Sequence, residues 1–352
     1  MGRMGQEHAT ISQVAEAAGV SMTTVSRYLN GKYEYMSDET RRRIAAVVDR
    51  LDYRPSRIAR SLKTRVSRSV GCVMADVGSP FSSLLLKGVD GVCSKAGYQV
   101  LFADAADSPE KERAAIQELL ASRVDGLIVN TTGGSDGFLA GLRRRGIPLV
   151  LADRRLAKDG VLDTVTAENT RASFACMRHL RGAGFAHVAF FTQEIGRISP
   201  RRERREAFLR ATRELFGADG AGLVFETGAG SAEPYAALKE LRARFAGERL
   251  AVLCVNGMTT LQTLQAVRRL GWHLDESFGV CGFDDWEWME LIPPGITAIA
   301  KDSRAIGARA AELLMRRIGG GGPPETVTLE LESSLRVRGS TDPALAARFF
   351  GG

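Results

Sequence analysis

The sequence predicts an α/β protein in which a small helix-turn-helix domain precedes a larger body of two lobes built on parallel sheets. Two observations carry this prediction. Residues 10–31 contain two short helical segments joined by a glycine turn, which is the pattern of a helix-turn-helix. From residue 69 onward, continuous apolar runs alternate with amphipathic stretches, which indicates parallel strands covered by helices on both faces. Because this alternation is too long for one open sheet, we expect two similar lobes.

The first helical segment begins at Thr10, whose hydroxyl can cap the helix, and Gln13 completes a capping box. Gly19 permits the tight turn, and Ser21 can cap the second segment. The apolar side chains form one seam: Val14, Ala15, Ala18, Val20, Val25 and Leu29. The outer face keeps side chains suited to base edges and phosphates: Met22, Thr23, Thr24, Ser26 and Arg27. We therefore predict that this segment binds DNA.

A third helix is expected after Ser37, which can cap it, and its apolar stripe, which ends near Leu51, can close a small three-helix core. Pro55 breaks this helix. The next segment, 57–63, is basic and only one to two turns long, and so short a helix is marginal in water. We expect this segment to order only against a partner.

The positive charge of the chain is concentrated at its beginning. Of the net charge of +7, residues 1–68 carry +6, from 13 Lys and Arg against 7 Asp and Glu. Residues 69–352 hold the other 35 and 34, which leaves +1. The excess coincides with the helix-turn-helix, as a phosphate-binding surface requires.

The body is predicted to alternate strands and helices. Strands are expected at 69–75, 99–103, 126–130, 148–152, 188–192, 251–255 and 279–283. Helices are expected at 82–96, 110–121, 170–182, 201–216, 233–245, 258–270 and 303–318. Residues 319–324 form a loop, and 326–338 form one or two extended strands.

Several classes of protein are excluded by what the sequence lacks. No apolar run approaches the ~18 residues of a membrane span, and the first ten residues lack the apolar core of an export signal. Cys72, Cys254 and Cys281 lie in apolar runs and are expected as buried thiols. The four histidines show no metal-ligand spacing, and no nucleophile elbow or phosphate-binding loop occurs. We expect a cytoplasmic protein with no enzymatic activity, cofactor or metal.

The order of these parts resembles the lac repressor family of bacterial transcription regulators from Thr10 to about Ser340. The motifs are the helix-turn-helix, MSDETRRRIAAVVDRLDYRPS, IARSLKT, the D-x-x-x-P-F element at 76–81, VDGLIV, GFDD at 282–285 and IPPGITAIA. The resemblance implies a periplasmic-binding-protein-like body. It also implies a DNA-binding domain at 1–55, a hinge helix at 56–66, a body at 67–342 and a tail at 343–352. Within the body it implies an N lobe of about 67–166 and 302–328, and a C lobe of about 167–301 and 329–342.

For DNA binding, the resemblance implies that Met22, Thr23 and Arg27 enter the major groove. It implies that Leu62 of the hinge wedges into the minor groove at the operator centre; the alternative is that Leu62 anchors the linker on the body. The other DNA contacts expected are Thr10, Ser21, Thr24, Ser26, Asn30, Tyr53, Ala59 and Lys63. The long turn at 31–37 and the segment 282–300 are similar to members that control uronate and keto-sugar-acid catabolism.

Between the lobes, the resemblance implies an effector cleft with contacts from Asp153, Arg204, Asn256 and Asp284. We add Asp76, Arg154 and the aromatic residues Phe81 and Trp286, whose rings could stack on a sugar; an ordinary core position is the alternative for Trp286. Lys301 stands where the family often has Gln. With Arg154 and Arg204 it would supply three cations, which suggests a sugar acid as the effector. The alternative is that Lys301 marks the crossover between lobes and points to solvent.

The function predicted is that of a homodimeric repressor, which binds a pseudopalindromic operator and responds to a small sugar or sugar acid. A dimer is favoured over a tetramer because the segment after Ser340 is too short for heptads. Two alternatives stay open. One is a regulator that responds to neutral sugars or purines, and the other is a sugar-binding protein of the transport type, which would have no use for residues 1–65.

Overall fold

The computed structural model describes residues 9–54, 66–158, 161–217, 223–228, 232–275, 277–321 and 325–350. The chain divides into two units, Met1–Arg68 and Ser69–Gly352, and each has its own hydrophobic core. Within the described residues, no helix combines the length and the apolar character needed to cross a membrane.

The first unit is a three-helix domain made of α1 (Ile11–Ala18), α2 (Met22–Leu29) and α3 (Asp38–Arg50). The predicted apolar seam and the stripe of the third helix form its core, with Val14, Val25 and Ile44 fully buried. Gly19 ends α1 in the left-handed conformation (φ 61°), which a residue with a side chain adopts at a cost. The helix-turn-helix predicted from the sequence is therefore confirmed.

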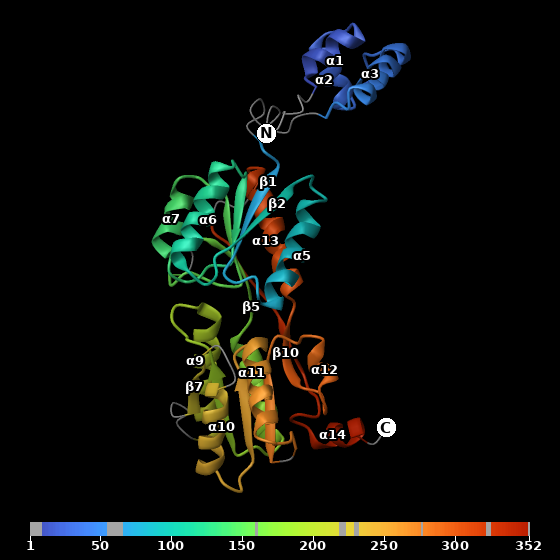
Figure 1. The fold of residues 1–352 in the computed structure, drawn as a ribbon. Coiled ribbons are helices and arrows are strands. Elements are labelled where there is room, and N and C mark those ends of the chain that lie inside the picture. Colours follow the sequence, from blue (N-terminus) through green and yellow to red (C-terminus); the bar gives the residue numbers. More distant parts are fainter. Residues whose placement is uncertain are drawn as a thin grey trace, which may run out of the picture. The chain divides into compact units, whose positions relative to one another are not determined.

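The first sheet of the body has the strand order β11-β5-β4-β3-β1-β2, and all its strands are parallel. Its strands are β1 (Ser69–Met74), β2 (Gln99–Asp104), β3 (Gly126–Val129), β4 (Leu149–Ala152), β5 (Asp163–Ala167) and β11 (Thr328–Leu331). Four helices cover it, α5 (Pro80–Cys93), α6 (Pro109–Ala121), α7 (Asp136–Arg144) and α13 (Ser303–Ile318). Together these elements form the N lobe (Figure 1).

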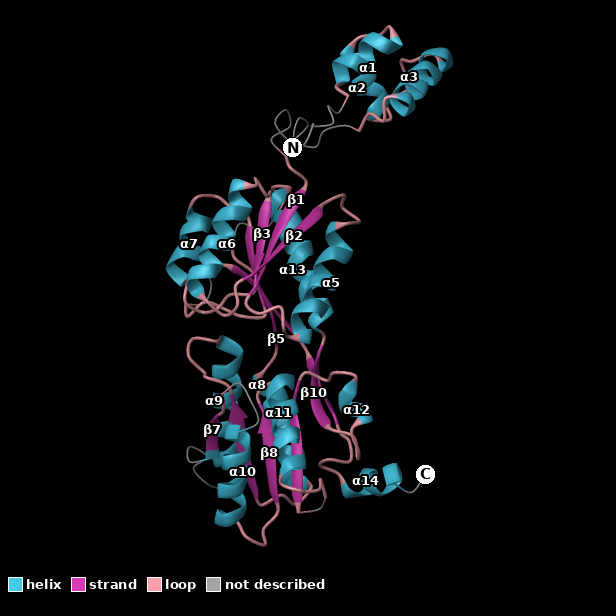
Figure 2. Cartoon of the chain, in the orientation of Figure 1, coloured by secondary structure: helices cyan, strands magenta, loops and turns pink. Residues whose placement is uncertain are grey.

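Alternate side chains of β1 enter two different cores, one on each face of the sheet. Cys72 and Met74 pack with residues of α5 and α13, such as Leu85 and Ile306. Val73, between them, packs with Ile116 of α6 and with residues of α7. From Val70 to Met74 the strand has no polar side chain and is buried, because both faces of a parallel sheet are covered. Figure 2 shows α6 and α7 on one face and α5 and α13 on the other.

The second sheet, which forms the C lobe, has the order β12-β10-β9-β8-β6-β7. Its strands are β6 (His187–Thr192), β7 (Val224–Glu226), β8 (Leu250–Cys254), β9 (Phe278–Phe283), β10 (Thr297–Lys301) and β12 (Ser333–Arg336). Its helices are α8 (Thr170–Gly182), α9 (Ser199–Phe216), α10 (Ala232–Arg244), α11 (Gly257–Arg269), α12 (Trp288–Leu291) and α14 (Pro343–Phe350). The sheet is parallel except for the antiparallel pair β10 and β12. All five cysteines of the body are free and buried.

The chain crosses between the lobes three times, after β5, after β10 and between β11 and β12. The third crossover differs from the prediction, which placed the change of lobe at 328/329. Because β11 pairs with β5 over Thr328–Leu331, these residues belong to the N lobe and the chain crosses at Glu332. The two sheets have the same order of strands, so that β4 in the N lobe corresponds to β9 in the C lobe.

The predicted lists of strands and helices lack six elements: β5, β7, β10, α7, α12 and α14. The strand β5 has the sequence DTVTA, whose polar residues are buried in this sheet. The strand β7 has only three residues. The helix α7 contains two glycines, and α14 lies in the segment expected to be a tail.

Candidate functional site

The outer face of α2 presents the side chains that the sequence assigned to DNA. Met22 is 55% exposed, an unusual value for a large apolar side chain, and Thr23 and Arg27 are exposed beside it. Thr24 and Ser26 are half-buried. A protruding apolar side chain at the start of the second helix of this motif suits contact with the methyl groups and edges of bases.

Three of the polar residues assigned to DNA also form hydrogen bonds that stabilise the ends of α1 and α2. Thr10 caps α1, accepting a hydrogen bond from the backbone N–H of Gln13, while its own N–H donates to Gln13 Oε1 over 2.7 Å. Ser21 caps α2 by accepting from the N–H of Thr24. Asn30 Nδ2 donates to the carbonyl of Ser26 over 2.7 Å. The helix caps expected at Thr10 and Ser21 are confirmed, as is the one at Ser37. Contact with DNA stays a prediction for Thr10, Ser21 and Asn30.

The other DNA contacts expected lie at or beyond the end of this unit. Tyr53 is half-buried and packs against the three-helix core. Ala59, Leu62 and Lys63 lie outside the described residues, so the hinge and the role of Leu62 stay predictions.

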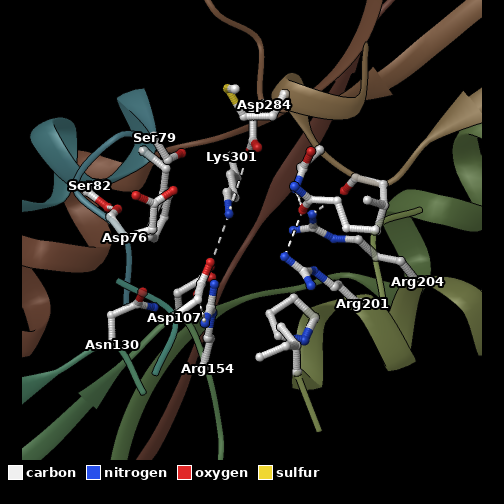
Figure 3. A pocket seen from close by; sticks show the side chains of 18 residues that line it. Asp76, Ser79, Ser82, Asp107, Asn130, Arg154, Arg201, Arg204, Asp284 and Lys301 are labelled. Carbon is white, nitrogen blue, oxygen red and sulfur yellow. Dashed lines mark hydrogen bonds and ion pairs between the residues drawn. The ribbon is translucent and has the colours of Figure 1, made fainter. Parts of the chain in front are cut away.

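In the body, a cavity of about 90 Å³ lies where the carboxyl ends of the two sheets face each other. Its lining includes eight of the nine residues predicted to bind the effector: Asp76, Phe81, Asp153, Arg154, Arg204, Asn256, Asp284 and Lys301 (Figure 3). Five of them lie within two residues after the end of a strand: Asp76, Asp153, Arg154, Asn256 and Asp284. α/β folds bind ligands at this edge of a sheet. The volume suits a small molecule, since one water molecule occupies about 10–15 Å³ by a comparable measure.

Lys301 lies between two carboxylates, one from each lobe. Its Nζ is 3.1 Å from Oδ1 of Asp153 and 3.3 Å from Oδ1 of Asp284, and its side chain is 5% exposed. The ammonium group also lies 4.2 Å from the centre of the Phe81 ring. Burial alone would raise the pKa of Asp153, but the charges of Lys301 and Arg204 hold this pKa below its ordinary value. Lys301 therefore does not point to solvent, and the carboxylates of Asp153 and Asp284 already compensate its charge.

Arg204, on α9, is held rigidly at the C-lobe side of the cavity and is 3% exposed. Its Nε donates to Oδ1 of Asn169 over 2.8 Å and its Nη1 donates to the carbonyl of Val255 over 2.6 Å. The guanidinium group lies 3.8 Å from the centre of the Phe283 ring. Burial lowers the pKa of Arg204, against the charges of Asp284 and Asp153.

Asn256 has two tasks besides lining the cavity. Its Oδ1 caps α11 by accepting from the N–H of Thr259, and its Nδ2 donates to Oε1 of Gln193 over 2.9 Å. Asn256 is thus held in place by its own lobe, as a residue that positions a ligand must be.

Trp286 is the one predicted effector residue that does not line the cavity. It is 9% exposed and packs against the start of α11, where a Cβ atom added to Gly257 would lie 2.6 Å from its ring. Its ring also meets that of Trp288 edge-on, with centroids 6.2 Å apart. Trp286 therefore lies away from the cavity in this structure, at the core position that the sequence analysis left open as the alternative.

The cavity also has polar lining residues that the sequence analysis missed: Ser79, Ser82, Asp107, Asn130, Gln193 and Arg201. The sequence contains a signal for two of these residues. Asn130 follows β3 and Gln193 follows β6 without a gap, so the rule that places ligands at the carboxyl ends of strands would have found both. Arg201 belongs to a dense basic run, 201–205. The sequence alone does not indicate which of these arginines lines the cavity.

Comparison with known proteins agrees with this geometry. Residues 10–56 match the bacterial regulatory proteins of the lacI family, and residues 177–341 match the periplasmic binding protein-like domain. The HTH-type transcriptional regulator KdgR of Bacillus subtilis (strain 168) is 38% identical over 331 residues, which cover 94% of this chain and 97% of that protein. The chain belongs to the lacI family. It is a DNA-binding transcriptional regulator with an effector-binding body, and it is not an enzyme.

Solved structures show the same architecture for this regulator. The lac repressor dimer bound to operator and the anti-inducer ONPF matches with a TM-score of 0.84 at 22% identity, covering 96% of this chain and 100% of that one. The complex of the transcriptional regulator CelR with cellobiose matches with a TM-score of 0.70 at 25% identity, covering 94% and 99%. The predicted fold, a helix-turn-helix followed by a two-lobed body, is confirmed.

Proposed function

We propose that this regulator is a repressor whose binding to a pseudopalindromic operator is controlled by a sugar acid. The observation that carries the effector class is the composition of the cavity, where four carboxylates, Asp76, Asp107, Asp153 and Asp284, face three arginines. Carboxylates accept hydrogen bonds from sugar hydroxyls, and arginines bind a carboxylate through paired N–H groups. A ligand that has both hydroxyl groups and a carboxylate is a sugar acid. The regulator would bind it in the cytoplasm.

Two further observations support a carbohydrate. CelR, which shares the fold at 25% identity, is solved in complex with cellobiose. In this regulator, the motifs at 31–37 and 282–300 resemble those of members that control sugar-acid catabolism. The small volume of the cavity favours a monosaccharide derivative over an oligosaccharide.

We also propose that the regulator is a homodimer and that β2 contributes to the interface. This strand is an edge of the N-lobe sheet and is largely exposed. It carries Leu101, 37% exposed, and Phe102, 62% exposed. Exposed apolar side chains on an edge strand are typical of a surface that another chain covers. A two-fold axis would then match the symmetry of the operator.

The cleft would communicate with DNA through the relative positions of the lobes. Asp153 belongs to the N lobe, Asp284 to the C lobe, and Lys301 lies at the crossover between them. A ligand that competes for these groups changes the balance between open and closed lobes. The predicted hinge directly precedes β1 of the N lobe. A movement of the lobes would therefore shift the helix–coil equilibrium of the hinge. A coupling of about 1–3 kcal/mol is usual for such linkage.

The proposal is tested by a thermal-shift screen of sugar acids, their phosphates and the matching neutral sugars. The ligands that bind are then added to the regulator on DNA selected from a pseudopalindromic library, and operator binding is measured by fluorescence anisotropy. We expect sugar acids to raise the melting temperature and to change the affinity for DNA. Equal responses to neutral sugars and sugar acids would contradict the effector class, and a ligand that binds without changing DNA affinity would contradict control by effector.

A further inference from the structure

The positive charges that line the cavity are not equally available to a ligand. Lys301 is enclosed by Asp153, Asp284 and the Phe81 ring, at 3.1, 3.3 and 4.2 Å. An anion could reach this ammonium group only by displacing carboxylates already in contact with it. An anionic ligand therefore needs another partner.

Arg201, three residues before Arg204 on α9, has neutral partners only. Its Nη1 donates to the carbonyl of Glu194 over 2.6 Å, and its Nη2 donates to the amide oxygen of Gln193 over 2.7 Å. Across the described residues, it forms no ion pair with a carboxylate. No carboxylate in the described part of the chain therefore lies within ion-pair distance of Arg201, although the charges of Asp107 and Glu194 act on it from farther away.

Arg204 provides an N–H group without a partner. Its Nη2 is buried and has no hydrogen-bond partner within the described structure, although its Nε and Nη1 are both occupied. Leaving a buried charged donor unpaired costs more free energy than a typical hydrogen bond contributes. The stacked ring of Phe283 keeps the guanidinium plane in place, so this donor is held ready for an acceptor.

A third guanidinium group approaches from the opposite lobe. Arg154 Nη1 donates to the carbonyl of Thr131 and lies 3.6 Å from Oδ1 of Asp107, which is 55% exposed. Burial, and next the charge of Arg154, lowers the pKa of Arg201 to about 10, so that Arg201 is still protonated at neutral pH. Arg154, Arg201 and Arg204 line the same cavity as Lys301 (Figure 3). Like charges this close are stabilised by an anion placed between them.

We propose that Arg201 is the residue that selects acidic over neutral effectors, and that with Arg204 and Arg154 it forms the subsite for the carboxylate of the ligand. This inference rests on the proposed sugar-acid function and assigns the acid group to the arginine side of the cleft. Lys301 then serves as the tie between the two lobes. Since Arg154 comes from the N lobe and the other two arginines from the C lobe, a carboxylate held by all three also bridges the lobes.

The test compares two ligands that differ only in the acid group, D-gluconate and D-glucitol, with 2-keto-3-deoxy-D-gluconate as a second acid. Isothermal titration calorimetry measures their affinity for the unmodified regulator and for Arg201→Gln, Arg205→Gln and Lys301→Gln. Arg205 lies on the same helix and carries the same charge, but it does not line the cavity. Circular dichroism melting curves confirm that each variant is folded.

We expect Arg201→Gln to weaken acid binding by about tenfold to a hundredfold, the usual effect of losing a charged hydrogen bond. The affinity for D-glucitol should stay within about twofold, and Arg205→Gln should bind acids as the unmodified regulator does. Acid binding that survives Arg201→Gln but loses its acid preference in Lys301→Gln would overturn the subsite while leaving the sugar-acid function intact. Binding of D-glucitol and not of either acid by the unmodified regulator would overturn the proposed function itself.

Discussion

Asp153 and Asp284 occupy equivalent positions in the two lobes and contact the same ammonium group. Each follows an equivalent strand, β4 or β9, and each has a left-handed backbone, with φ of 67° and 68°. Each N–H donates to the neighbouring strand, Asp153 to the carbonyl of Val165 and Asp284 to that of Ile299. This shared geometry directs both carboxylates into the cleft. Aspartate tolerates the left-handed conformation better than most residues do.

Removing the ammonium group should destabilise the body. Lys301→Met keeps most of the side-chain volume but leaves Asp153 and Asp284 buried beside each other without their cation. The free energy of unfolding should fall by about 3 kcal/mol, measured by urea denaturation at pH 7. Lys158→Met, at an exposed position, serves as the control and should change it by less than about 0.5 kcal/mol. Similar losses in the two variants would contradict the role given to Lys301.

The contribution of Asp153 to stability should disappear in acid. Burial opposes its charge, but Lys301 and Arg204 hold the pKa below the ordinary 3.8. Because the folded pKa is lower than the unfolded one, the stabilisation is complete above the unfolded pKa and is lost as the pH falls through the folded pKa. The difference in unfolding free energy between the unmodified protein and Asp153→Asn should therefore shrink below about pH 4. A difference that stays constant from pH 6 to pH 3 would contradict this.

The start of α11 has no room for a side chain at Gly257. A Cβ atom there would lie 2.6 Å from the Trp286 ring, whereas one on Gly137 of α7 would meet open space. Gly257→Ala should lower stability by about 1–3 kcal/mol through overpacking. Gly137→Ala should raise it by up to about 1 kcal/mol, because alanine favours helix. Differential scanning calorimetry of both variants decides the matter, and shifts of the same sign would count against the packing described.

Substitutions on the outer face of α2 should affect DNA recognition, and substitutions on its inner face should affect folding. Met22→Ala, at an exposed position, should change which operator bases are preferred without altering thermal unfolding. Val25→Ala, at a fully buried position, should destabilise the three-helix domain by about 2 kcal/mol. Selection of DNA sites, followed by anisotropy and circular dichroism, measures both effects. Unchanged base preference in Met22→Ala would show that Met22 does not read DNA.

A charge on the exposed edge strand should separate the proposed dimer. Phe102→Glu places a carboxylate on β2, and sedimentation equilibrium should then show monomers. Leu329→Glu makes the same kind of change on β11, at the opposite edge of this sheet, and should leave the dimer intact. Dissociation by Leu329→Glu alone would place the interface at the other edge of the sheet.

The sequence could predict most of the fold because its signals are local. Thr10 and Gln13 satisfy each other within one helical turn, and the apolar strands β1, β8 and β9 are recognisable one at a time. The missed strand β5 shows the limit of this approach. Its sequence DTVTA is half polar, and it is buried because β4 and β11 pair with it on either side, which no local pattern reveals.

By itself, the sequence determined the DNA-binding unit and the two-lobed body, since helix caps and apolar strands are properties of short segments. With the family resemblance, it also named eight residues that line the cavity. Only the tertiary structure decided which charged side chains of the cleft are available to a ligand. Lys301 meets Asp153 across 148 positions of sequence, and Trp286 turns away from the cavity because Gly257 leaves space for its ring. Charge compensation depends on distances between segments, and a linear pattern does not contain those distances.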